Sequence, residues 1–160
     1  NARAMVEHFR TAIYYQPPEG RMSHYSAAWF DWGELMPDGR TQPIQFVPGT
    51  TTCLARQQDG KIISQTYRLI EDVLEPGETE VNCEYSSPNP VVYTARYFDR
   101  HGSELASSTL TLKARSPQFE RFRGPVAVPK GAVFVRHEFT FKGGFRIVTF
   151  GMGKHRMREG

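Results

Sequence analysis

Short apolar runs separated by turn signals are the feature that most limits how this chain can fold. From residue 25 onward, turn-forming groups recur about every 8–12 residues, a spacing typical of β-sandwiches and β-barrels. Clear examples are Pro37-Asp38-Gly39, Pro48-Gly49 and Asp99-Arg100-His101-Gly102. The runs between them are too short for the helices that connect the strands of a parallel sheet. We therefore predict an all-β fold, an antiparallel β-sandwich.

Alternation of apolar and polar residues predicts which side chains face the core. The expected inward sets are Val81, Cys83 and Tyr85 on one strand, Ile63, Gln65, Tyr67 and Leu69 on an earlier strand, and Val133, Val135, Phe139 and Phe141 on a later strand. His137 falls on the inward face of that later strand, where a hydrogen-bonded core histidine is a more common outcome than a ligand. Residues 91–98 are apolar on both faces, which predicts a central strand covered on two sides.

Two further features concern connections between strands. Asp59-Gly60 and Lys142-Gly143-Gly144 are predicted to close β-hairpins. Residues 116–131 are predicted to form a long connection that ends at Pro129-Lys130-Gly131.

The first 20 residues differ from the rest of the chain. Helical spacing is shown by Ala4, Met5, Phe9, Ala12 and Ile13, and Pro17-Pro18 would end any helix. We expect a connector or short helix over residues 1–20 and a β-sandwich binding domain over residues 21–160. Because the chain opens with Asn1 in the middle of a pattern, we also expect it to be part of a longer protein with flanking domains.

Composition and charge exclude several classes of protein. Hydrophobic residues make up 39% and aromatic residues 12% of the chain. These shares are too high for a disordered chain. The net charge is only +3, and the basic Lys154-His155-Arg156-Met157-Arg158 lacks accompanying aromatic residues, so we expect no nucleic-acid partner. No apolar run approaches the ~20 residues of a membrane span. Cys53 and Cys83 have no metal-binding spacing and are expected to be free thiols, unless their strands are neighbours.

Four segments in order resemble the jelly-roll carbohydrate-binding modules and their galactose-binding-like relatives. They are Ile63-Ser64-Gln65-Thr66-Tyr67-Arg68-Leu69 with the later Pro76-Gly77, Ala95-Arg96-Tyr97-Phe98-Asp99-Arg100-His101-Gly102, Pro125-Val126-Ala127-Val128-Pro129-Lys130-Gly131-Ala132, and the closing run 144–152. The resemblance implies a jelly roll that holds a carbohydrate ligand. In these modules an acidic residue often follows the closing run, and here it is missing. No motif therefore supports a structural calcium ion, and no cofactor is expected. An extracellular or surface-associated location is favoured.

The first candidate binding segment is Trp29-Phe30-Asp31-Trp32-Gly33-Glu34. An indole ring packs against the C–H face of a sugar, and a carboxylate accepts hydrogen bonds from its hydroxyl groups. Trp29, Asp31, Trp32 and Glu34 are therefore predicted ligand residues, although core burial of either tryptophan is an open alternative. Asp31 and Glu34 also form the best carboxylate pair for acid/base catalysis.

The second candidate is the polar face of the predicted sheet. Its predicted ligand residues are Arg68, Asn82, Glu84, Arg96 and Arg136, and Glu138 lies on the same face. If their strands are adjacent, these side chains form one charged surface; a plain solvated face is the alternative. Tyr93 is included as a ligand residue, although core burial is the favoured interpretation.

These observations support three hypotheses. The first is a non-catalytic carbohydrate-binding module of a larger protein. The second is a protein-interaction or structural β-sandwich module of an assembly, since a fold does not determine a function. The third, a polysaccharide-active enzyme, rests on Asp31 and Glu34 alone and ranks last. Five scattered histidines show no metal-ligand spacing.

Overall fold

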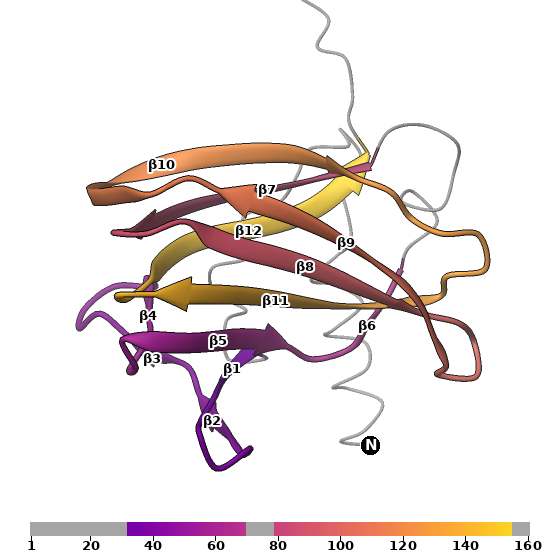
Figure 1. The fold of residues 1–160 in the computed structure, drawn as a ribbon, viewed down its shortest axis with the longest axis horizontal. Coiled ribbons are helices and arrows are strands. Elements are labelled where there is room, and N and C mark those ends of the chain that lie inside the picture. The colour runs from indigo at the N-terminus through magenta and orange to yellow at the C-terminus, as the bar shows by residue number, and fades with distance from the viewer. Residues whose placement is uncertain (1–31, 70–78, 155–160) are drawn as a thin grey trace, which may run out of the picture.

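A computed structural model describes residues 32–69 and 79–154 of the chain (Figure 1). These residues form the strands β1–β12 and contain no helix, and therefore no helix that could cross a membrane. Several predictions lie outside the described residues: the connector over residues 1–20, the side chains of Trp29 and Asp31, and the Pro76-Gly77 turn.

The strands form two antiparallel sheets. Sheet A has the order β2-β1-β5-β11-β8-β9, with β6 also beside β11. Its strands are β1 (Trp32–Leu35), β2 (Thr41–Pro43), β5 (Asp59–Ser64), β6 (Tyr67–Arg68), β8 (Val91–Phe98), β9 (Glu104–Leu112) and β11 (Phe134–Lys142). Sheet B has the order β10-β7-β12-β4-β3. Its strands are β3 (Gln45–Phe46), β4 (Cys53–Leu54), β7 (Thr79–Ser87), β10 (Arg115–Val126) and β12 (Arg146–Lys154).

The sheets pack face to face around an aromatic core. The ring of Phe150 on β12 lies 5.8 Å from that of Tyr93 on β8 and 5.7 Å from that of Phe139 on β11. Fully buried aromatic residues of this size dominate the energy of a core, because each removes a large apolar area from water. The predicted all-β antiparallel sandwich is confirmed.

The two cysteines lie on separated strands of sheet B. Cys53 on β4 pairs with Ile147, and Cys83 on β7 pairs with Phe150, so β12 runs between them. Both side chains are buried and both thiols are free, as predicted.

Hairpins at three of the predicted turns are confirmed. Residues 36–40 join β1 to β2, residues 99–103 join β8 to β9, and residues 47–52, with Pro48-Gly49, join β3 to β4. In the second turn, Oδ1 of Asp99 accepts hydrogen bonds from the amides of His101 (2.8 Å) and Ser103 (2.9 Å). The φ of Gly102 in this turn is 85°. A residue with a side chain rarely adopts such a positive φ, so glycine suits this position.

The hairpins predicted at Asp59-Gly60 and at Lys142-Gly143-Gly144 are wrong. Asp59 and Gly60 are the first residues of β5, and the glycines of residues 143–144 lead from β11 in sheet A to β12 in sheet B. Turn residues indicate where a chain reverses, but they do not say which sheet the next strand joins.

The long connection predicted over residues 116–131 is also wrong. Residues 115–126 form β10, an edge strand that pairs with β7. Its residues are mostly exposed, so the burial contrast that produces alternation is small, and its register shifts between Arg115 and Glu120.

Two of the predicted faces need correction. In β5, Ile62 and Ser64 point inward and Ile63 outward; the chain then bends, so that Tyr67 and Leu69 are buried while Gln65 is exposed. The two-sided burial predicted for residues 91–98 is wrong, because Val92 on the outer face is 36% exposed. The inward faces of β7 and β11 are otherwise as predicted, except that Val133 is only partly buried.

Candidate ligand-binding site

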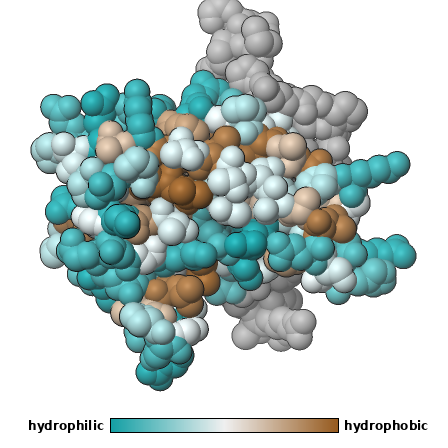
Figure 2. Space-filling view, in the orientation of Figure 1, coloured by the Kyte–Doolittle hydropathy of each residue, from teal (hydrophilic) through white to brown (hydrophobic). Residues whose placement is uncertain are grey.

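The outer face of sheet A presents a cluster of charged side chains around Glu138. On β11, Arg136 and Glu138 alternate with buried Val135, His137 and Phe139, so the two charged side chains point away from the core. We call this surface the polar face and define it by Lys61, Arg68, Arg96, Phe98, Glu104, Phe134, Arg136 and Glu138. Figure 2 shows hydrophilic residues over much of the molecular face seen in the orientation of Figure 1, with hydrophobic patches between them.

Strand register brings these residues together. Arg136 on β11 is paired with Arg96 on β8, and Phe134 is paired with Phe98 on one side and with Arg68 of β6 on the other. Directly paired residues in antiparallel strands have side chains close enough to interact. The polar face is therefore built from segments far apart in the sequence.

Glu138 is the centre of the charge network. Its Oε2 accepts hydrogen bonds from Nε of Arg96 (2.7 Å) and Nη2 of Arg136 (2.9 Å). Its Oε1 lies 3.2 Å from Nζ of Lys61, and Arg96 also reaches Glu104 at 3.3 Å. Only 5% of the Glu138 side chain is exposed, whereas the three cations are about one-third exposed.

These contacts decide the ionisation of the carboxylate. Burial acts to raise the pKa of Glu138, but the hydrogen bonds from Arg96, Arg136 and Lys61 outweigh burial and lower that pKa below its usual value. The hydrogen bond to Glu138 in turn raises the pKa of Arg96. Glu138 is thus ionised at neutral pH and fixes three cations at the surface.

Aromatic rings border the arginines. The guanidinium carbon of Arg136 lies 5.8 Å from the ring centre of Phe98. A cation and an aromatic ring attract each other at this separation. Phe98 and Phe134 are both partly exposed. Nε of Arg136 is buried and makes no hydrogen bond within the described residues. The polar face thus combines apolar rings with hydrogen-bond donors.

A groove adjoins one end of the polar face. It has a volume of about 650 Å³ and lies between the β1–β2 hairpin and strands β5 and β11. Leu35 and Met36 line it from the β1–β2 hairpin, and Thr140 and Lys142 line it from β11. Lys61 belongs to both the groove and the network around Glu138. A chain-like ligand could therefore lie along both.

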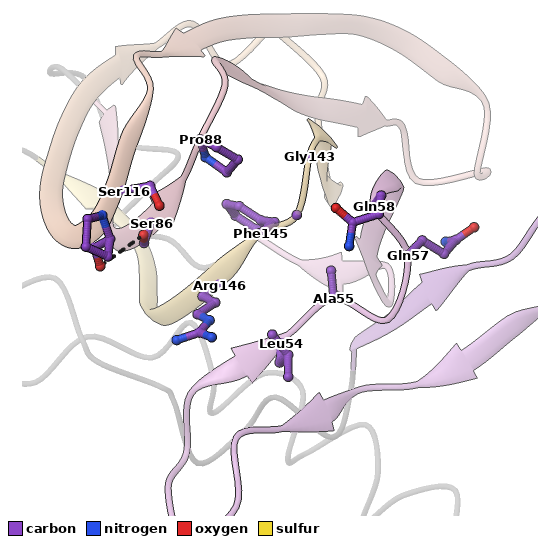
Figure 3. A pocket seen from close by; sticks show the side chains of 12 residues that line it. Leu54, Ala55, Gln57, Gln58, Ser86, Pro88, Ser116, Gly143, Phe145 and Arg146 are labelled. Atoms are coloured by element: carbon purple, nitrogen blue, oxygen red, sulfur yellow. Dashed lines mark hydrogen bonds between the residues drawn. The ribbon is translucent and has the colours of Figure 1, made fainter.

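A second cavity, of about 320 Å³, lies among the connections between the sheets (Figure 3). Its lining includes Gln57 and Gln58 before β5, Gly143 after β11, and Phe145, which lies in the middle of the view. The single hydroxyl proton of Ser86 is shared between the carbonyl groups of Arg115 (3.0 Å) and Pro117 (3.4 Å). Its hydroxyl is thus engaged within the protein.

Three predicted ligand residues are buried, and their predicted placement at a ligand surface is corrected. Trp32 is 4% exposed and stacks on His137 at 5.9 Å, so the core alternative describes it. Tyr93 is 1% exposed and is a core residue, as the favoured interpretation has it. Glu34 is 1% exposed, because its carboxylate accepts hydrogen bonds from backbone amides of the loop after β4.

Glu34 holds the loop after β4. Its Oε1 accepts a hydrogen bond from the amide of Arg56 (2.7 Å), and its Oε2 accepts hydrogen bonds from the amide (2.9 Å) and side chain (3.0 Å) of Gln57. Both oxygen atoms are occupied, so this carboxylate serves the structure of the protein. No group of three or more His, Cys, Asp or Glu side chains within the described residues is arranged to hold a metal ion.

His137 is a hydrogen-bonded core residue, as expected. Its Nδ1 lies 2.6 Å from the hydroxyl of Tyr93, and its backbone amide donates to Oγ of Ser64 at 2.8 Å. Burial lowers the pKa of His137 to about 3 and raises that of Tyr93 well above its usual value. His137 is therefore neutral, and its ring shares a hydrogen bond with the Tyr93 hydroxyl inside the core.

The predicted single charged surface is divided between the two sheets. Arg68, Arg96 and Arg136 lie together with Glu138 on sheet A, whereas Asn82 and Glu84 lie on β7 of sheet B, on the opposite outer face. Alternation identifies outward residues but not the sheet to which their strand belongs. The predictions missed Lys61, Phe98 and Phe134. A signal for the two phenylalanines was available, because Phe98 lies two residues after Arg96 and Phe134 two residues before Arg136, and alternate residues of a strand share a face.

Comparison with known proteins identifies similar folds. No family model matches the chain, and no curated protein matches its sequence. It is similar to the family 11 carbohydrate-binding module of a Clostridium thermocellum cellulase, Lic26A-Cel5E, with a TM-score of 0.58 and 12% identity over 88% of this chain and 96% of that module. For the C-terminal family 22 module of Clostridium thermocellum Xyn10B, the TM-score is 0.53 and the identity 11%, over 91% and 100%.

A bacteriophage protein gives a third comparison. The enzymatically active domain of bacteriophage CBA120 tailspike protein 4 aligns with a TM-score of 0.50 and 18% identity, over 64% of this chain and only 15% of that chain. The two carbohydrate-binding modules, by contrast, match along nearly their whole length. This chain therefore has the jelly-roll β-sandwich fold of carbohydrate-binding modules, as the sequence resemblance implied.

Proposed function

We propose that this chain is a non-catalytic carbohydrate-binding module of a larger protein, with the polar face and its groove as the ligand surface. The observation that carries the proposal is the placement of Phe98 and Phe134 beside Arg96 and Arg136 on one exposed sheet face. Sugars bind through this combination, because their C–H faces pack on rings while their hydroxyl groups exchange hydrogen bonds with polar side chains.

Two further observations support the proposal. The neighbours that match this fold along nearly their whole length are named as carbohydrate-binding modules. The carboxylates of Glu34 and Glu138 are both engaged in hydrogen bonds with protein groups, which favours binding over acid/base chemistry. An open groove of about 650 Å³ beside a polar sheet face suits an oligosaccharide better than a small buried substrate.

Calorimetric titration of the chain with oligosaccharides of several classes tests this proposal. We expect saturable binding to at least one class. Phe98→Ala should weaken that binding by about fivefold, since a lost ring contact costs on the order of 1 kcal/mol. Phe119→Ala is the matched control, because Phe119 is a partly buried phenylalanine on β10 of the other sheet.

The proposal fails if no oligosaccharide binds, or if Phe98→Ala and Phe119→Ala weaken binding equally while both variants stay folded. A stable oligomer without any sugar affinity would instead favour the protein-interaction module.

A further inference from the structure

The polar face carries more positive than negative charge. It contains four cations, Lys61, Arg68, Arg96 and Arg136, and two carboxylates, Glu104 and Glu138. Glu138 lies beneath the cations with only 5% of its side chain exposed, so it orders them more than it repels a ligand. A molecule approaching this surface meets mainly hydrogen-bond donors with a net positive charge.

The arginines retain donors for a ligand. A guanidinium group has five N–H donors. Arg136 uses Nη2 for Glu138, whereas Arg68 is exposed and makes no ion pair with any part of the chain that the structure describes. Arginine binds carboxylate and sulfate groups with two parallel hydrogen bonds, and it does so most effectively where its position is already fixed.

Spacing favours a ligand with repeated negative charges. Arg68, Arg136 and Arg96 come from the adjacent strands β6, β11 and β8. Three neighbouring strands at ordinary spacing span about 10 Å. Lys61, Lys142 and the carboxylate of Asp59, which is paired with Lys142, line the adjoining groove, so its lysines outnumber its carboxylates. Phe134 and Phe98 are level with Arg68, two residues along their strands from Arg136 and Arg96. They offer flat apolar rings, which a sugar ring can use and a plain anion cannot.

We propose that the polar face binds acidic saccharides, whose carboxylate or sulfate groups are held by Arg68, Arg96 and Arg136. This inference rests on the proposed carbohydrate-binding function and specifies its ligand class. Carboxylated and sulfated sugars share the anionic chemistry that the arginines recognise, and separate ligands can distinguish them.

The test is a calorimetric comparison of oligogalacturonate, chondroitin sulfate oligosaccharides and neutral xylo- and gluco-oligosaccharides of matched length. We expect at least one acidic series to bind about tenfold or more tightly than the neutral series, as one or two charge-assisted hydrogen bonds would provide. The affinity for that acidic series should fall as NaCl rises from about 0.05 M to about 0.5 M, because the Debye length, over which charges attract each other, falls below ~10 Å.

Arg68→Ala provides the matched variant, because Arg68 is exposed and its removal leaves no buried partner among residues 32–69 and 79–154. It should weaken acidic binding by about tenfold, a clearly larger loss than in the binding of the neutral series. The control is Arg121→Ala, which removes the same charge from β10 on the outer face of sheet B and should have little effect.

The outcomes distinguish a failure of the acidic ligand class from a failure of the carbohydrate-binding function on which it rests. Neutral oligosaccharides that bind as tightly as acidic ones would overturn the acidic ligand class and leave a carbohydrate-binding module. No binding to any oligosaccharide would overturn both. Equal binding to polyglutamate, which has carboxylates but no sugar rings, would show a general polyanion surface and overturn the inference. Equal losses of affinity for the acidic oligosaccharide in Arg68→Ala and Arg121→Ala would also overturn it.

Discussion

Arg136 and Glu138 lie two residues apart on β11 and are joined by a hydrogen bond of 2.9 Å from Nη2 to Oε2. The two residues share the outer face, because alternate residues of a strand point the same way. Arg96 from β8 reaches the same oxygen atom at 2.7 Å. One buried carboxylate thus organises cations from different strands, and the stability of sheet A and the arrangement of its polar face depend on the same residue.

Replacing Glu138 by Gln should destabilise the domain. The variant removes the negative charge that compensates Lys61, Arg96 and Arg136, and these cations are only about one-third exposed. We expect urea denaturation at pH 7 to show a loss of about 1–3 kcal/mol in the free energy of unfolding. The lowered pKa of Glu138 also predicts that its stabilising contribution in the wild type is lost as the pH falls through that lowered value.

Glu104→Gln is the control for this substitution. Glu104 contacts Arg96 at 3.3 Å, but 47% of its side chain is exposed. Exposed ion pairs contribute at most about 1 kcal/mol, so this variant should change stability little. Equal losses in the two variants would contradict a special role for Glu138.

The buried His137 should make stability depend on pH in mildly acidic solution. Its pKa is about 3 in the folded protein against 6.5 for an ordinary histidine. Between these values the unfolded chain binds more protons, so the free energy of unfolding falls as the pH is lowered. We expect a loss of about 2 kcal/mol between pH 7 and pH 5, measured by urea denaturation.

His137→Gln should be less stable at pH 7 but lose less stability between pH 7 and pH 5, because its side chain does not titrate. His101→Gln, at an exposed position in the β8–β9 turn, should keep the wild-type dependence on pH. If the free energy of unfolding of His137→Gln falls between pH 7 and pH 5 as steeply as that of the wild type, another group is responsible.

Local patterns in the sequence predicted much of the sandwich and less of its site. Alternation correctly placed Cys83 and Tyr85 inward and Arg136 outward, because each strand has one face in the core. It could not assign strands to sheets, and so it grouped Glu84 with Arg136 although they lie on opposite faces of the molecule. Long-range pairing decides that question, and no local signal encodes it.

The aromatic-acidic segment illustrates a different limit. Trp32 and Glu34 have the composition of a sugar site, yet both are buried. Trp32 fills space beside His137, and Glu34 meets the backbone amides of two residues from a distant part of the chain, Arg56 and Gln57. Their roles are set by partners that the sequence brings close only after folding.

Glu34→Ala should destabilise the loop after β4. The substitution leaves the amides of Arg56 and Gln57 without their acceptor in a part-buried location. We expect a loss of about 2–4 kcal/mol in the free energy of unfolding, since unsatisfied buried donors are costly. Asp38→Asn, at an exposed carboxylate in the β1–β2 turn, should be close to neutral; a similar loss in both variants would contradict this role for Glu34.

The two thiols should be unreactive in the folded protein. Burial raises the pKa of Cys53 to about 12 and that of Cys83 still further. Neither side chain therefore forms an appreciable amount of thiolate, the reactive species, at pH 8. Titration with a thiol reagent should detect no fast reaction in buffer and two reactive thiols in denaturant. Rapid modification of the native protein, or only one thiol in denaturant, would contradict the structure.

The central claim is that the polar face of sheet A binds the saccharide, and amide chemical-shift mapping during titration with an acidic oligosaccharide tests it most directly. We predict that the largest shifts fall on β6, β8 and β11, around Arg68, Arg96 and Arg136, and in the adjoining groove at Lys61. Shifts confined to the cavity around Phe145, or to the outer face of sheet B around Asn82, would contradict the claim.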